Sequence, residues 1–169
     1  MPTKSQIRKM AEDLLNQNGV TTAPVAVEKI AVSGGADVKR VDMKEDLSGF
    51  SYADTIGVNL RHAPVRQRFT IAHELGHMLL HTRDLHYDGK FVQFRDKVSS
   101  SGIDPQETAA NLFAAELLMP KKFIDKDLED LLALDIEDDD AIGALADKFE
   151  VSRQAMTVRL VSLGYLGSV

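Results

Sequence analysis

Two histidines and a glutamate within one short stretch have the residue types and spacing needed for metal-assisted hydrolysis. Residues 68–81 read RFTIAHELGHMLLH and contain the HExxH pattern formed by His73, Glu74 and His77. On an α-helix, His73 and His77 lie about 6 Å apart along the axis and about 40° apart around it, so both imidazoles can reach one metal ion. Glu74, beside the first histidine, is placed to act as general base toward a water on that metal. The pattern therefore predicts a zinc hydrolase site.

Two histidines can also fall at this spacing by chance on a packed helix, so the surrounding residues decide between the interpretations. An apolar stripe runs along the segment and consists of Phe69, Ala72, Gly76 and Leu79. Pro64 suits the first turn of such a helix. Gly76 weakens a helix interior by up to about 1 kcal/mol, which makes sense if something must approach its backbone closely. This context favours the metal site.

A catalytic zinc needs a third protein ligand and an open position for water. His81 lies two turns beyond His73, about 12 Å along the same axis, and is too far away to share the metal. A third histidine six residues after His77 is also absent, because that position is Arg83. The third ligand must therefore come from another segment.

A helix expected over residues 104–119, capped by Asp104, offers Glu107 and Glu116. These glutamates are nine residues apart and occupy nearly opposite faces, so only one can face the metal. We predict Glu107, because Asn111 one turn later can hydrogen-bond a ligating histidine and fix its ring. The competing interpretation makes Glu107 the N3 residue of a capping box with Asp104. The ligand role is favoured because a site with two histidines otherwise lacks an anion.

The elements that must position these residues indicate one α+β domain spanning residues 1–169. A chain of 169 residues with 44% hydrophobic and 27% charged residues is long enough for one core and short for two. Apolar residues recur at helical spacing in five further segments, which are residues 5–18, 22–31, 122–134, 141–149 and 153–163. The fold is therefore expected to be mainly helical.

Between Asp37 and Leu60 the apolar residues change from helical spacing to an alternating pattern, which predicts three short strands. Such closely spaced strands favour a small, mostly antiparallel sheet packed on the HExxH helix. Residues 49–52 are the candidate edge strand along which an extended substrate could add, although they fit an ordinary hairpin equally well. Residues 91–94 could form another short strand, and residues 99–102 read as a flexible connector.

Residues 138–169 predict a helix-turn-helix-like pair of helices, with Ser152 capping the second one. The charged residues between 147 and 169 sum to +1 and are Asp147, Lys148, Glu150, Arg153 and Arg159. This charge is low for a DNA reader, so a protein-docking or core-covering role is expected.

Whole-chain properties narrow the class of protein further. The net charge is −6 and the sequence pI is near 5.3, with an acidic run at residues 137–140, so neither direct nucleic-acid binding nor membrane attraction is expected. No signal-peptide pattern and no apolar run of membrane-spanning length occur, which predicts a cytoplasmic protein. The chain has no cysteine, so any metal must be held by His, Asp or Glu.

Three segments together resemble the ImmA/IrrE family of zinc metallopeptidases. They are RFTIAHELGH at residues 68–77, ETAANLFAAELLMP at 107–120, and the tail from FEVS at 149–152 to Leu163-Gly164, within a match that runs from about residue 22 to 166. The resemblance implies a gluzincin-like core in which Glu107 is the distant glutamate. It also implies site-specific cleavage of a helix-turn-helix repressor, which frees the genes that the repressor controls. Some members carry a fused DNA-binding domain that this sequence lacks, so the expected partner is a separate repressor.

The expected mechanism uses zinc held by His73, His77 and Glu107, with Glu74 as base and later as proton donor to the leaving amine. The side chain that stabilises the developing oxyanion stays open among four candidates, which are Tyr52, His81, His86 and Tyr87. One rival hypothesis is a non-catalytic metal-containing module that binds a repressor or DNA through its C-terminal helices. A second rival is a hydrolase of small amides or esters.

Overall fold

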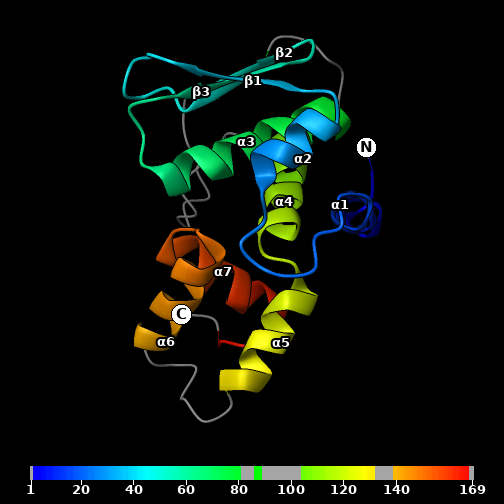
Figure 1. Ribbon diagram of the computed structural model, residues 1–169, viewed down its shortest axis with the longest axis vertical. Helices are drawn as coiled ribbons and strands as arrows, with labels where there is room; N and C mark the ends of the chain where they lie inside the picture. The colour runs from blue at the N-terminus through cyan, green and yellow to red at the C-terminus, as the bar shows by residue number, and fades with distance from the viewer. Residues whose placement is uncertain (1, 81–85, 89–103, 132–138, 168–169) are drawn as a thin grey trace.

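The computed structural model describes residues 2–80, 86–88, 104–131 and 139–167. Its helices are α1 (Lys4–Gln17), α2 (Val27–Ser33), α3 (Pro64–Leu80), α4 (Pro105–Leu118), α5 (Lys121–Leu131), α6 (Asp139–Phe149) and α7 (Arg153–Leu163). Its strands are β1 (Asp37–Val41), β2 (Gly49–Tyr52), β3 (Thr55–Asn59) and β4 (His86–Asp88). Figure 1 shows the sheet lying across α3 at one end of the molecule, with α5, α6 and α7 at the other. The mainly helical α+β class is confirmed.

Most helix boundaries lie where the sequence predicts them, because capping residues fix them. The Asp104 side chain accepts a hydrogen bond from the Gln106 amide at the start of α4, and Ser152 caps α7 in the same way. Gly164 ends α7 with a φ of 80°, a left-handed conformation that glycine adopts without strain. The second helix is an exception and begins at Val27, later than expected. The carbonyl of the preceding Val25 accepts hydrogen bonds from the Val27 amide and from Arg68, which keeps it outside a helix.

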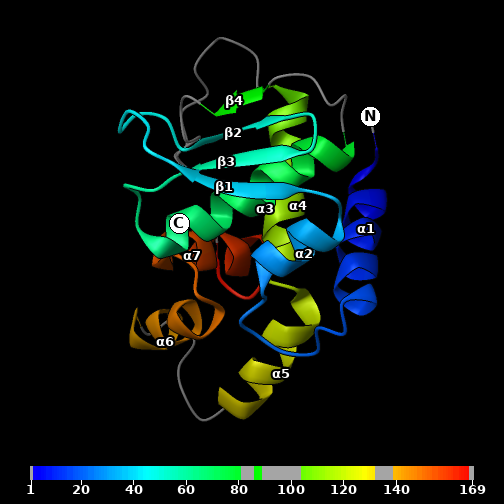
Figure 2. The ribbon, with the colours of Figure 1, turned by 45° about the horizontal axis from the view of Figure 1, so that its top comes forward.

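The described sheet has four strands in the order β1-β3-β2-β4, one strand more than the sequence predicts (Figure 2). The β2–β3 and β2–β4 pairs are antiparallel, so the sheet is mostly antiparallel as expected, whereas β1 and β3 are parallel. The parallel pair arises because β3 returns between β1 and β2 instead of adding at the outside. The expectation that residues 49–52 form an edge is wrong, since β2 has a partner on each side. The expected strand at 91–94 and the connector at 99–102 lie outside the described residues.

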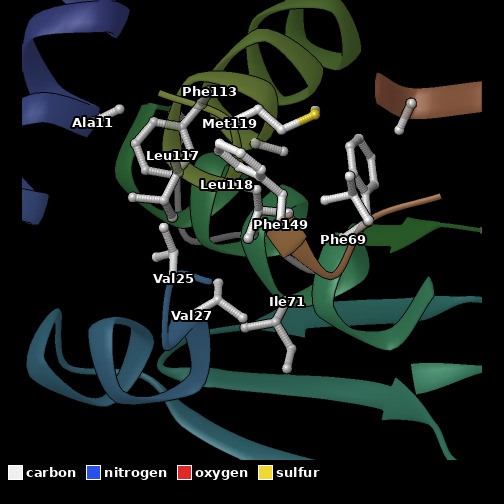
Figure 3. Packing of buried hydrophobic residues seen from close by; sticks show 14 of the residues in the cluster. Ala11, Val25, Val27, Phe69, Ile71, Phe113, Leu117, Leu118, Met119 and Phe149 are labelled. Carbon is white, nitrogen blue, oxygen red and sulfur yellow. The ribbon is translucent and has the colours of Figure 1, made fainter. Parts of the chain in front are cut away.

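The hydrophobic core forms where α4 meets α3 and the C-terminal helices. Phe113, Leu117 and Leu118 of α4 are fully buried and belong to the same hydrophobic cluster as Phe149 (Figure 3). Phe149, at the end of α6, is itself fully buried. The C-terminal pair of helices is therefore part of the core, as its expected core-covering role requires.

A buried ion pair joins α7 to α4. Arg159 is 3% exposed, and its two terminal nitrogens donate to the two carboxylate oxygens of Glu116 at 2.9 and 2.6 Å. Its Nε also donates to the carbonyl of Met119 at 3.0 Å, just after the end of α4. Arg8 of α1 reaches the same carboxylate at 2.9 Å from a more exposed position. This network fixes the end of α4 between the first and last helices.

Among the helices that the structure describes, none combines the length and apolar character needed to cross a bilayer.

Candidate metal centre

The HExxH residues lie on the buried middle of α3. This helix begins at Pro64, as the sequence predicts, and runs between the sheet and α4. His73 and His77 are each 4% exposed, and Glu74 is fully buried. Buried polar side chains at these positions are costly unless they bind a partner, so their surroundings reveal their role.

The structure brings Glu107 of α4 against both histidines. His73 Nε2 lies 3.4 Å from Glu107 Oε2, and His77 Nε2 lies 3.2 Å from Glu107 Oε1. The two Nε2 atoms are 3.1 Å apart. Three potential ligand atoms therefore converge on one point from two helices that are separated by more than twenty residues of sequence.

Asn111 stands beside this group and sets the orientation of His73. The Nδ1–H of His73 donates to the Asn111 Oδ1 at 3.1 Å. An imidazole that donates from Nδ1 carries its lone pair on Nε2, the nitrogen that faces Glu107 and His77. The interaction has the form that metal-ligating histidines commonly make with a supporting oxygen.

This donor set fits a zinc ion. Ligands at about 2.0–2.1 Å in a tetrahedral zinc site lie about 3.3–3.4 Å from one another. The measured separations of 3.1, 3.2 and 3.4 Å are close to that spacing. Two neutral imidazoles and one carboxylate also supply the mixed nitrogen and oxygen set typical of catalytic zinc, which keeps its fourth position for water.

Gly76 explains how α3 and α4 come close enough to share the site. A Cβ atom at Gly76 would lie 3.1 Å from Phe113 Cδ1, 3.2 Å from Ala110 Cα and 3.3 Å from the Ala110 carbonyl oxygen. These contacts are shorter than normal packing distances, and two of them involve the backbone of α4. The sequence-based expectation of a close approach at Gly76 is therefore met by the helix that carries Glu107.

Glu116 does not take part in the centre. Its carboxylate binds Arg159 and Arg8 instead, nine residues along α4 from Glu107. Glu107 and Glu116 thus lie on opposite faces of α4, as the helical period predicts. Glu107, which is also a candidate capping residue, has its carboxylate against the histidines.

One contact at the centre has no counterpart in the sequence reasoning. The Ser51 hydroxyl on β2 donates to Glu74 Oε2 at 2.6 Å, and Ser51 is 3% exposed. The available signal was the strand period, which puts the small residues Gly49 and Ser51 on one face of β2. Nothing in the sequence indicated which helix residue that face would meet.

Of the four candidates for oxyanion stabilisation, those that the structure describes occupy different positions relative to Glu74. Tyr52 is 58% exposed and follows Ser51 along the strand, so it lies on the face of the sheet away from Glu74. His81 lies outside the described residues. His86 and Tyr87 belong to β4, where their backbones pair with Ser51 and Phe50, respectively. Tyr52 is therefore not brought to the centre, and the donor stays open among the other three.

Two imidazoles, a carboxylate from a second helix and a buried glutamate beside the first imidazole are the side-chain types that HExxH metal hydrolases use. The family comparison agrees, since the model of the IrrE N-terminal-like domain, a peptidase family, matches residues 35–161. This match covers more than half of the sequence, and the chain belongs to that peptidase family.

One relative is similar to part of this chain. The radiation response metalloprotease IrrE of Deinococcus deserti is 36% identical over 96 residues, which are 56% of this chain and 31% of the relative. The match thus spans about a third of the relative's length. The chain thus belongs to a peptidase family and is similar to a metalloprotease over part of that protein's length.

Proposed function

We propose that the chain is a zinc-dependent endopeptidase that cleaves a helix-turn-helix transcriptional repressor at one site. The observation that carries the proposal is the convergence of His73, His77 and Glu107 beside the buried Glu74. The similarity to the ImmA/IrrE family supports the choice of a repressor as substrate. Cleavage would free the genes that such a repressor controls.

His73, His77 and Glu107 would hold the ion, and Asn111 would keep His73 in the ligating tautomer. When bound, zinc supplies a Lewis acid that lowers the pKa of a water and polarises the scissile carbonyl. Glu74 would accept the proton of the attacking water and later deliver it to the leaving amine. Both transfers need Glu74 to be fixed in place and shielded from bulk water, and its complete burial supports this.

The rival DNA-binding hypothesis finds little support in the C-terminal helices. Arg159 is buried against Glu116, and Lys148 donates to Asp127 at 2.6 Å. The Arg153 guanidinium lies over Gly143, on the neighbouring helix α6. Arg159 and Lys148 are therefore paired with carboxylates of the protein, whereas DNA affinity depends on cations directed at phosphates.

The decisive experiment mixes the zinc-loaded protein with purified helix-turn-helix repressors from the same genome, beginning with any encoded beside its gene. The wild type should produce one discrete cut, located by mass spectrometry. Glu74→Gln should bind zinc with unchanged affinity and leave the repressor intact. Cleavage by purified Glu74→Gln at the wild-type rate would contradict the assignment of the base.

Two further measurements separate the rivals. Turnover of small amides or esters by a protein that cleaves no repressor would favour the small-molecule hydrolase. Salt-dependent DNA binding by the full chain, with a slope set by several phosphate contacts, would favour the binding module. Neither is expected.

A further inference from the structure

We propose that Ser51 is a positioning residue for Glu74, holding the carboxylate in the orientation that proton transfer requires. The inference rests on the proposed peptidase function. It adds to that function a residue outside the HExxH motif and outside the helix that supplies Glu107. Ser51 acts through Glu74 and does not itself contact the reacting atoms.

The hydrogen bond between these residues is short and shielded. The Ser51 Oγ to Glu74 Oε2 distance is 2.6 Å, within the range of hydroxyl donors to ionised carboxylates. Ser51 is 3% exposed and Glu74 is fully buried, so bulk water has little access to the hydrogen bond between them. Interactions between such groups are stronger in the protein interior than at its surface.

The contact is built into the packing of β2 on α3. A Cβ atom at Gly49 would lie 2.5 Å from Thr70 Cγ2, so β2 can lie this close to α3 only because residue 49 is glycine. Two residues later on the strand, Ser51 meets Glu74, which is four residues after Thr70 on the helix. Two strand residues advance about 6.8 Å and four helix residues about 6 Å, so the two contacts stay in step.

This geometry gives Ser51 a specific effect. A buried carboxylate with one oxygen fixed by a hydroxyl has a defined plane, because rotation about its last bond would break the hydrogen bond. With Oε2 held by Ser51, the proton-accepting role falls to Oε1. A freely rotating carboxylate reaches the productive orientation only part of the time, which lowers the rate without altering substrate binding.

The chain offers a matched control in Ser48. Like Ser51, Ser48 is buried, and its hydroxyl accepts a hydrogen bond from Arg66 of α3 at 2.9 Å. It does not contact Glu74 in this way. Ser48→Ala therefore removes an equally buried hydroxyl while leaving the proposed base untouched.

The experiment compares Ser51→Ala, Ser51→Thr and Ser48→Ala with the wild type and Glu74→Gln. Zinc affinity is measured by chelator competition, and kcat and KM are measured on the repressor found in the cleavage assay. We expect Ser51→Ala to lower kcat about 10- to 100-fold with KM and zinc affinity unchanged. Ser51→Thr should restore most of kcat because it keeps the hydroxyl, and Ser48→Ala should leave kcat near the wild-type value.

A second arm needs neither metal nor substrate. Urea unfolding of the metal-free wild type, Ser51→Ala, Glu74→Gln and the double variant forms a double-mutant cycle. We expect clear non-additivity between the two substitutions, and additive effects would overturn the proposal. The Ser48→Ala and Glu74→Gln pair should be additive.

The outcomes separate this inference from the proposed function. If Glu74→Gln is inactive and Ser51→Ala turns over at the wild-type rate, Ser51 has no positioning role and the peptidase function stands. If Glu74→Gln cleaves as fast as the wild type, the assignment of Glu74 as the base fails, and this inference fails with it. If the wild type cuts no repressor, the proposed function fails, and the unfolding cycle still tests the coupling between Ser51 and Glu74. A loss of zinc binding in Ser51→Ala would also overturn the inference, since Ser51 would then act on the ligands.

Discussion

Arg159 of α7 and Glu116 of α4 form a bidentate ion pair in the protein core, with N–O distances of 2.9 and 2.6 Å. A pair in which both partners are buried costs much desolvation, and removing one partner leaves the other charge uncompensated. The pair lies at the far end of the helix that carries Glu107. It therefore links the integrity of the C-terminal helices to that of the metal centre.

We expect Arg159→Met to lower the free energy of unfolding by about 3–5 kcal/mol, measured by urea titration. The control is Arg8→Ala, which removes the third member of the network. Because the Arg8 side chain is 56% exposed, its loss should cost only about 0–1 kcal/mol. Equal effects of the two substitutions would contradict the importance of burial at Arg159.

The same network predicts how stability depends on pH. Burial raises the pKa of Glu116, but hydrogen bonds and charge from Arg159, and then from Arg8, lower it by more, so the pKa lies below its usual 4.5. The stabilisation from ionised Glu116 is thus fully present above pH 4.5 and is lost as the pH falls through the lower pKa of the folded state. Unfolding free energies measured between pH 7 and 3 should decline more steeply for the wild type than for Glu116→Gln. Parallel curves would contradict this contribution.

Two interior helix glycines should respond to alanine in opposite ways. At Gly76 a Cβ would meet the α4 backbone 3.2 Å away, whereas at Gly143 the nearest atom is a terminal nitrogen of the flexible Arg153, 2.6 Å away. Gly143→Ala should therefore stabilise the protein by up to about 1 kcal/mol, because alanine has a higher helix propensity than glycine.

Gly76→Ala should instead separate α3 from α4 and so weaken zinc binding, because the ligands come from both helices. Chelator competition measures this directly, with Gly143→Ala as the matched control. Unchanged zinc affinity in folded Gly76→Ala would mean that the close approach at Gly76 is not needed for the site.

Removal of the support for His73 should affect the metal more than the fold. Asn111→Ala takes away the acceptor of the Nδ1–H bond, and we expect zinc affinity to fall about 10- to 100-fold. A suitable control is Asn16→Ala on α1, whose side-chain oxygen accepts a hydrogen bond from the exposed Lys122 at 3.3 Å. Zinc should also raise the unfolding temperature, and the increase should be smaller for Asn111→Ala than for the wild type.

Local chemistry explains why much of the fold and site was predictable. Asp104, Pro105, Ser152 and Gly164 act on the turn in which they occur, so their effects are readable from a short window of sequence. His73, Glu74 and His77 share one helix, and their geometry follows from its period. The choice of Glu107 over Glu116 used the same period together with the need for an anion.

Contacts between distant segments were harder to predict. The parallel β1–β3 pair depends on how the sheet is assembled, which strand periodicity does not specify. From the sequence alone Arg159 is one more charge of the tail, because its burial depends on Glu116, more than forty residues earlier. The contact from Ser51 to Glu74 likewise requires the register of a strand against a helix.

The burial of Arg159 and Phe149 also limits how the C-terminal helices can work. Their inward faces are part of the core, which favours a fixed position over movement as a separate recognition unit. A macromolecule that docks on their outward faces would meet a surface fixed relative to His73, His77 and Glu107. The fold would then set the spacing along that macromolecule between the docked segment and the bond that is cut.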